Sequence, residues 1–143
     1  MSTPKNTKKI LLVEDDSMVQ TVHTMYLEEL GYTPDIAQNG QQALELTQKN
    51  QYALILMDIG LPDMTGIDVV KKIRAGGKNQ RTPIVALTGF SPEDVIAKCL
   101  AAGMEKVFFK PTDATTLQQI ITQFATQDLA KSMKQRKQRG KVV

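Results

Sequence analysis

The sequence predicts an α/β fold in which five parallel strands form one sheet and helices cover both of its faces. Short apolar runs alternate along the chain with segments whose apolar residues recur at helical spacing, and five such strand–helix pairs follow one another. Parallel strands need right-handed crossovers, which place helices on both faces of the sheet. We expect a doubly wound three-layer sandwich with strand order 2-1-3-4-5.

The five expected strands are short and apolar, and turn or capping residues bound each of them. Apolar runs of this length are typical of strands that are buried on both faces of a sheet. They cover residues 9–13, 33–37, 52–57, 83–87 and 106–109.

The first expected helix covers residues 17–30 and is followed by Gly31, a residue typical of helix C-termini. His23, the only histidine of the chain, is expected on the surface of this helix, because no second metal-ligating residue stands at motif spacing. The apolar residues expected on one face of this helix are Val19, Val22, Met25, Tyr26 and Leu30.

Four further helices are expected between and after the remaining strands. Two of them cover residues 40–49 and 66–75. The next begins at the sequence SPED, where Ser91 can cap the helix and Pro92 suits its first position. The last begins near Asp113.

Charge is unevenly distributed along the 143 residues. We expect a polar, flexible leader (residues 1–7), one compact domain (residues 8–127) and a basic tail (residues 128–143). Six of the 18 basic residues lie within residues 131–143, which contain no acid, and the rest of the chain carries 12 bases against 15 acids. The tail is interpreted as a solvated extension, with contact to nucleic acid, anionic lipid or an acidic partner as the alternative.

Several protein classes are excluded by composition. The longest apolar run, residues 53–57, is far shorter than the roughly 20 residues of a membrane-spanning helix. The basic N-terminus lacks the apolar segment of a secretory signal, so a cytoplasmic location is expected. Cys99 is the single cysteine, which rules out an internal disulfide and a thiolate metal cluster and suggests a thiol that packs within a helix.

Polar side chains follow four of the expected strands at the point where each strand ends. Four of the five strands are neighbours in the expected order, so these side chains should converge in one crevice at the carboxyl edge of the sheet. They are Glu14, Asp15 and Asp16 after the first strand, Asp58 after the third, Thr88 after the fourth and Lys110 after the fifth.

Clustered carboxylates predict a metal ion in this crevice. Several carboxylates cannot all ionise within a few ångströms of one another unless a cation offsets their repulsion. Ligation by oxygen alone favours Mg²⁺, or alternatively Mn²⁺, over zinc or copper. The sequence contains neither the G-x-x-x-x-G-K-[ST] nor the G-x-G-x-x-G fingerprint, so no nucleotide cofactor is expected.

Residues 8–127 resemble the receiver domain of bacterial two-component response regulators. The sequences LLVEDD, LILMDIGLPDMTG, PIVALTG and FFKP occur in the order and spacing of that family. The resemblance implies a phosphoaspartate switch or relay module that catalyses its own Mg²⁺-dependent phosphorylation and slow dephosphorylation. Either a stand-alone regulator or the receiver of a hybrid histidine kinase fits these motifs.

The resemblance also implies roles for individual residues. Asp58 would be the phosphoacceptor and, with Asp15, a direct Mg²⁺ ligand, while Glu14 would bind the ion through water. The backbone carbonyl of Gly60 would supply a further ligand. Thr88 would hydrogen-bond a phosphoryl oxygen.

Other residues beside the crevice receive more specific expectations from the family pattern. Lys110 would pair with the phosphoryl group or, before it arrives, with Asp58, and the Lys110–Pro111 bond would be cis. Asp16 is expected to provide charge at a helix N-terminus and not to bind metal. Val107 stands where the family often has an aromatic residue, so a weak conformational switch is expected.

The expected partner is a sensor histidine kinase or a histidine phosphotransfer protein that docks near the first helix, and no DNA-binding output domain is expected in this chain. Two alternatives stay open at this point. One is a flavodoxin-like cofactor-binding module with the same three-layer sandwich, and the other is a degenerate receiver that serves only as a docking surface.

Overall fold

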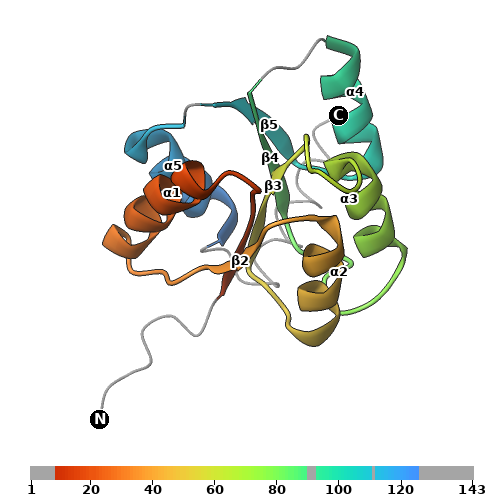
Figure 1. The fold of residues 1–143 in the computed structure, drawn as a ribbon, viewed down its shortest axis with the longest axis horizontal. Coiled ribbons are helices and arrows are strands. Elements are labelled where there is room, and N and C mark those ends of the chain that lie inside the picture. Colours follow the sequence, from red (N-terminus) through yellow and green to blue (C-terminus); the bar gives the residue numbers. More distant parts are fainter. Residues whose placement is uncertain (1–8, 90–92, 111, 126–143) are drawn as a thin grey trace, which may run out of the picture.

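The computed structural model describes residues 9–89, 93–110 and 112–125, which form a single five-stranded parallel sheet with helices on both sides (Figure 1). The sheet order is β2-β1-β3-β4-β5, so the predicted topology is confirmed. The strands are β1 (Ile10–Val13), β2 (Asp35–Ala37), β3 (Leu54–Asp58), β4 (Ile84–Thr88) and β5 (Lys106–Phe109).

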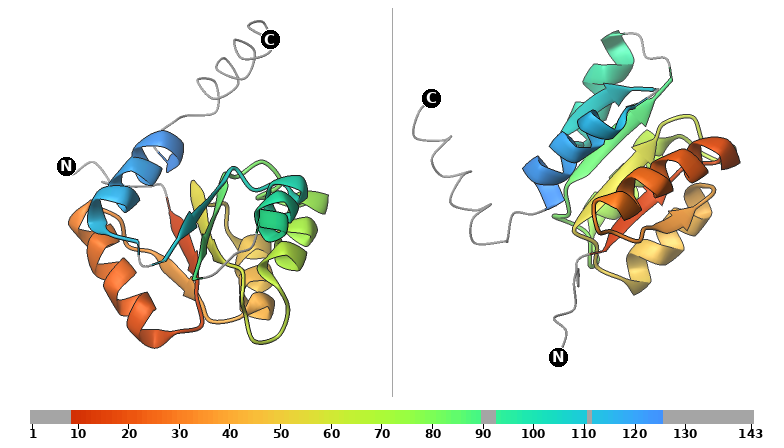
Figure 2. Two further views of the ribbon diagram at one scale, coloured as in Figure 1. Left: turned by 90° about the horizontal axis from the view of Figure 1, so that it is seen from above. Right: turned by 90° about the vertical axis from the view of Figure 1, so that its left-hand side faces the viewer.

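The helices form the two outer layers of the sandwich. Helices α1 and α5 cover one face of the sheet, and α2, α3 and α4 cover the other (Figures 1 and 2). Their bounds are α1 (Ser17–Glu29), α2 (Gly40–Lys49), α3 (Gly66–Ala75), α4 (Glu93–Ala102) and α5 (Ala114–Ile120), with a π-helix (Ile121–Ala125) that continues α5.

Some expectations fall on residues outside this description. These are the leader and the basic tail, the cap at Ser91 and Pro92, and the cis bond before Pro111. The predicted bounds of α2 and α3 agree with the structure, whereas β2 is shorter than expected because Thr33 and Pro34 precede the strand.

Alternation along the buried strands divides the core into two layers, because successive side chains of a strand point to opposite faces of the sheet. Cys99 of α4 is fully buried in the layer under α2, α3 and α4, as expected of a packing thiol. The strand residues under α1 and α5 are Ile10, Leu12, Leu54, Leu56, Val85 and Leu87. Those under α2, α3 and α4 are Leu11, Val13, Ile55, Met57, Ile84 and Ala86.

The inner face of α1 differs from the sequence prediction. Its fully buried residues are His23 and Leu27, whereas Val22 and Met25 are 38% and 57% exposed. The predicted apolar face was therefore wrong by part of a turn, and the prediction that His23 lies on the surface was wrong: only 2% of it is exposed. Spacing explains the difference, because Leu27 and Leu30 follow His23 by four and seven positions and share its side of the helix.

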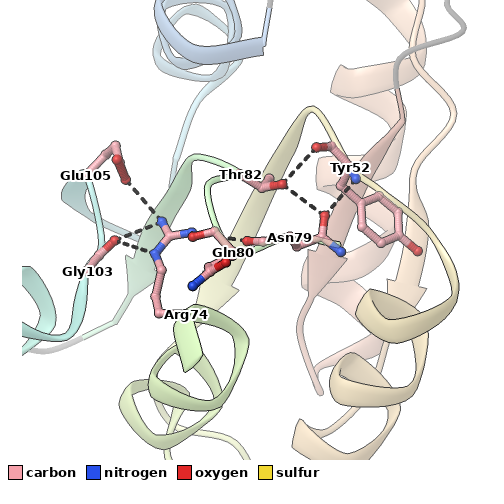
Figure 3. A network of polar contacts seen from close by, with 7 residues as sticks. All are labelled: Tyr52, Arg74, Asn79, Gln80, Thr82, Gly103 and Glu105. Atoms are coloured by element: carbon pink, nitrogen blue, oxygen red, sulfur yellow. Dashed lines mark hydrogen bonds and ion pairs between the residues drawn. The ribbon is translucent and has the colours of Figure 1, made fainter. Parts of the chain in front are cut away.

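A buried asparagine organises the edge of the sheet where the strands begin (Figure 3). Asn79, 1% exposed, accepts hydrogen bonds from the Tyr52 amide (2.8 Å) and the Thr82 hydroxyl (2.9 Å) through Oδ1. Its Nδ2 donates to the carbonyls of Thr47 and Asn50, each at 2.7 Å. One side chain thus joins the end of α2, the approach to β3 and the approach to β4.

An arginine extends this network towards α4. The Arg74 guanidinium donates to the Gly103 carbonyl at 2.8 and 3.1 Å and to the carbonyls of Asn79 and Gln80 (Figure 3). It also lies 3.4 Å from the carboxylate of Glu105. The end of α3 is therefore connected to the turn between α4 and β5.

The loop between β3 and α3 is attached to its surroundings at several points. The Gly66 amide donates to the Ile59 carbonyl at 2.8 Å, and Gly60 and Thr65 form an isolated antiparallel bridge. The Asp63 carboxylate accepts from the amides of Gly40 (2.8 Å) and Gln41 (2.9 Å) at the start of α2. These hydrogen bonds lower the pKa of Asp63, which favours its charged form at a helix N-terminus.

Candidate phosphorylation and metal site

The ends of β1, β3, β4 and β5 bring the predicted site residues to one edge of the sheet. β1 pairs with β3, β3 with β4, and β4 with β5, all in parallel register. Asp58 is the last residue of β3 and Thr88 the last of β4, and both are buried. The convergence expected from the strand order is therefore present.

Three acidic side chains form a cluster that could hold a metal ion. One carboxylate oxygen from each of Glu14, Asp15 and Asp58 lies within 4.8 Å of the others. Glu14 and Asp58 are only 2% and 7% exposed, while Asp15 is exposed. The donor set is all oxygen and carries several negative charges in little space, so its chemistry fits Mg²⁺.

Lys110 provides the positive charge next to this cluster. Its Nζ donates a 2.6 Å hydrogen bond to Glu14 Oε1 and lies 3.4 Å from Asp58 Oδ2. The expected pairing with Asp58 is present, but the shorter contact, with Glu14, was not anticipated. Burial acts to lower the pKa of Lys110, but the hydrogen bond to Glu14 and the nearby acids outweigh it and raise this pKa.

Asp58 has a strongly perturbed carboxyl group. Burial, followed by the negative charge of Glu14, raises its pKa to about 6, against the opposing effects of Lys110 and the Gly60 amide. That amide donates to Asp58 Oδ1 at 3.2 Å. A buried carboxylate beside a like charge is a group that a cation would stabilise.

The remaining predicted residues take different positions around the cluster. Asp16 is the N-cap of α1, where its Oδ1 accepts from the amides of Met18 (2.8 Å) and Val19 (3.1 Å). This agrees with the expectation that Asp16 lies at the helix N-terminus. Lys110 is attached to β4 through its backbone amide, which donates to the Thr88 carbonyl at 2.7 Å.

A groove of about 700 Å³ opens beside the acidic cluster, between α1 and the start of α5. Lys110 lines the groove and contacts Glu14 of the acidic cluster, so a molecule bound in the groove would lie next to the cluster. We name it the α1–α5 groove; its lining residues are Asp16, Met18, Val19, Val22, His23, Tyr26, Lys110, Thr112 and Asp113.

Two features of the site had no clear sign in the sequence. Lys110 and Glu14 are 96 positions apart, and only the three-dimensional arrangement places them together. The attachment of the loop after β3 to α2 through Asp63 likewise spans more than 20 positions. A helical wheel of α1 that included Leu27 could have placed His23 correctly.

Comparison with known proteins finds a family whose members match most of this chain. Residues 10–122 match the family described as the response regulator receiver domain. The aerobic respiration control sensor protein ArcB of Escherichia coli (strain K12) is 39% identical over 121 residues, which cover 83% of this chain. The match spans only 15% of ArcB, so it concerns one part of that larger protein. Within the described residues, no helix is both long and apolar enough to cross a membrane.

Solved structures show the same likeness. The receiver domain of the sensor histidine kinase PA1611 of Pseudomonas aeruginosa, with magnesium coordinated in its active-site cleft, is 36% identical with a TM-score of 0.78. The match covers 84% of this chain and 98% of that one. A co-crystal structure from Saccharomyces cerevisiae, of the histidine phosphotransfer protein Ypd1 with the Ssk1 receiver domain, matches with a TM-score of 0.74 and 27% identity. That match covers 82% of this chain and 88% of the other.

Proposed function

The chain belongs to the response regulator receiver domain family, and we propose that its Asp58 accepts a phosphoryl group from a phosphohistidine donor in a Mg²⁺-dependent reaction. The module would then act as a switch or relay and lose the phosphoryl group slowly by hydrolysis. Membership of this family sets aside the flavodoxin-like cofactor binder. A degenerate receiver is the alternative that experiment must test.

The arrangement of charges around Asp58 carries the proposal. Phosphoryl transfer asks a protein mainly to position the reactants and to compensate negative charge. Lys110 Nζ lies 3.4 Å from Asp58 Oδ2, and the pKa of Lys110 is raised. Lys110 therefore provides a permanent positive charge beside the nucleophilic carboxylate. Thr88, buried at the end of the neighbouring strand, is proposed to hydrogen-bond a phosphoryl oxygen.

The acidic cluster is proposed to hold Mg²⁺, with Mn²⁺ as the alternative ion. Asp15 and Asp58 would bind the ion directly, Glu14 through water, and Gly60 through its backbone carbonyl. When bound, the ion would supply positive charge for the phosphoryl oxygens. The magnesium in the cleft of the PA1611 receiver domain supports this assignment.

Asp58→Asn is expected to abolish phosphorylation of the protein. Asparagine has the size of aspartate but lacks the nucleophilic carboxylate. The protein is incubated with a small-molecule phosphodonor, with and without Mg²⁺, and its intact mass is measured. Wild type should gain one phosphoryl group only with Mg²⁺, and Asp58→Asn should gain none.

Asp16→Asn is the matched control for this experiment. It removes the same charge from a neighbouring acid but keeps an N-cap residue in place. We expect it to form the adduct as wild type does. A phosphoryl adduct of normal yield on Asp58→Asn would contradict the proposal, and no adduct on wild type would favour a degenerate receiver.

We expect Mg²⁺ affinity to decrease as the pH falls below about 6. The pKa of Asp58 is raised to about 6, so below that pH its carboxyl carries a proton that the cation must displace. Above that pH the carboxylate is already charged and affinity should be level. Calorimetric Mg²⁺ titrations should show a loss of about tenfold per pH unit on the acid side. Affinity that stays constant down to about pH 5 would count against this ligand role for Asp58.

The partner is proposed to be a sensor histidine kinase or a histidine phosphotransfer protein. The α1–α5 groove is a suitable docking place because Met18 and Val22 expose apolar surface there and Lys110 joins the groove to the site. The Ypd1–Ssk1 co-crystal structure supports a partner of this kind. A cytoplasmic location, as expected from the sequence, forms part of the same proposal.

A further inference from the structure

His23 is a buried imidazole beside the proposed phosphorylation site with no role in the function proposed so far. It is 2% exposed and lines the α1–α5 groove together with Lys110 and Thr112. Among the described residues, His23 Nδ1 and Thr112 Oγ1 are two of the few buried side-chain polar atoms that have no hydrogen-bond partner. A buried imidazole nitrogen without a partner is costly to protonate, because the added proton would find no acceptor.

Lys110 is the charged group that acts on His23. Burial first, and then the positive charge of Lys110, lower the pKa of His23 from 6.5. The strand residues beneath α1 and α5 are apolar, so the sheet adds no charge on this side. The other ionisable groups of the groove are Asp16, Tyr26 and Asp113.

The two carboxylates of the groove are engaged elsewhere. Asp16 caps α1, and Asp113 caps α5 by accepting from the Thr116 amide at 2.8 Å, which lowers the pKa of Asp113. Neither contributes to the altered pKa of His23. After burial, the ammonium of Lys110 is therefore the charge of the groove that lowers the pKa of His23.

Lys110 lines the α1–α5 groove together with His23 and also contacts the acidic cluster. Its ammonium contacts Glu14 at 2.6 Å and Asp58 at 3.4 Å, while its positive charge also reaches His23. A phosphoryl group on Asp58 would add negative charge beside this ammonium. The positive potential at His23 would then decrease, which makes the charged imidazole less costly.

We propose that His23 is a positioning residue that acts through Lys110 and takes up a proton from solvent when Asp58 receives a phosphoryl group. This rests on the proposed function of Asp58. The proton adds to an imidazole nitrogen, and His23 makes no bond to phosphorus. By linkage, a proton on His23 must favour the phosphoryl state by the same factor.

The first test uses the fact that the chain has one histidine, so its NMR signals need no further assignment. His23 is titrated with Mg²⁺ present, with and without beryllium fluoride as a phosphoryl-group analogue. We expect a pKa below 6.5 in the free protein and a rise of about 0.5 unit with the analogue. Lys110→Met should raise the pKa of His23 in the free protein, whereas Lys106→Met, at the far end of β5, should not.

The second test separates charge from packing. His23→Phe keeps a ring in the α1–α5 groove but cannot bind a proton. For wild type, affinity for the analogue should increase about threefold more than for His23→Phe as the pH falls through the pKa of His23. A purely structural role would give the two proteins parallel pH profiles and would overturn the inference.

The outcomes distinguish this inference from the proposed function. If the backbone amide signals show that the analogue binds, but the pKa of His23 does not change, the inference alone fails. If the analogue does not bind to wild type, the proposed function fails and this inference fails with it. An unchanged pKa of His23 in Lys110→Met would also overturn the inference, because the lysine would not be the link.

Discussion

Gly66→Ala is expected to destabilise the protein by about 3 kcal/mol and to impair phosphorylation. A Cβ at this first residue of α3 would overlap the carbonyl oxygen of Asp58 and lie 2.9 Å from Ile59 Cα. Both atoms belong to the backbone, so neither can turn away as a flexible side chain can. The end of β3 would have to move, and it is the part of the chain that presents Asp58 to the acidic cluster.

Urea unfolding followed by circular dichroism measures the first effect, and adduct formation by intact mass measures the second. Gly60→Ala is the control for stability, because a Cβ there meets no atom within 4 Å and the backbone angle φ is not positive. Its free energy of unfolding should stay within about 0.5 kcal/mol of wild type. A loss below about 1 kcal/mol for Gly66→Ala would show that β3 and α3 are less closely packed than the structure indicates.

Asn79→Ala is expected to cost about 4 kcal/mol of stability without changing the chemistry of folded molecules. The substitution leaves the Tyr52 amide and the carbonyls of Thr47 and Asn50 without this partner in a buried place. Each such group costs about 1–3 kcal/mol when water does not replace the bond. Asn79 lies where the strands begin, whereas Asp58 lies where they end.

Two further variants make this prediction specific. Asn79→Asp keeps the size and the acceptor but replaces two donors by an acceptor that faces two carbonyls, so it should be about as unstable as Asn79→Ala. Gln80→Ala, in the same loop but exposed, should lie within about 0.5 kcal/mol of wild type. At a temperature where each variant is folded, adduct formation should match wild type. Equal unfolding midpoints for Asn79→Ala and Gln80→Ala would refute the structural role of Asn79.

The strand ends explain why so much of the site could be anticipated. In a parallel sheet the residues at the carboxyl ends of the strands lie at one edge, so the sequence alone was enough to group Asp58, Thr88 and Lys110. The order of strands and helices could be predicted because short apolar runs alternate along the chain with segments of helical spacing. The position of Asp16 also followed from local chemistry, since an acid before a helix is a good N-cap.

Long-range polar contacts could not be anticipated in this way. Asn79 joins segments about 30 positions apart, and its surrounding sequence, GGKNQRTP, indicates only a turn. His23 was predicted on the surface because no metal-ligating partner stands at motif spacing, although helix geometry places it next to Leu27 in the interior. The π-helix at Ile121–Ala125 also has no distinctive sequence pattern, because its apolar spacing resembles that of an ordinary helix.

The attachment of Asp63 to the start of α2 bears on which part of this domain would move on phosphorylation. The segment between β3 and α3 is held by that carboxylate, by the Gly66 amide and by the bridge between Gly60 and Thr65. The loop beside Asp58 is thus tied to α2 and to the end of β3 by hydrogen bonds before any ligand binds. Displacement upon phosphorylation would then fall to the ends of β4 and β5, where Thr88 and Lys110 stand.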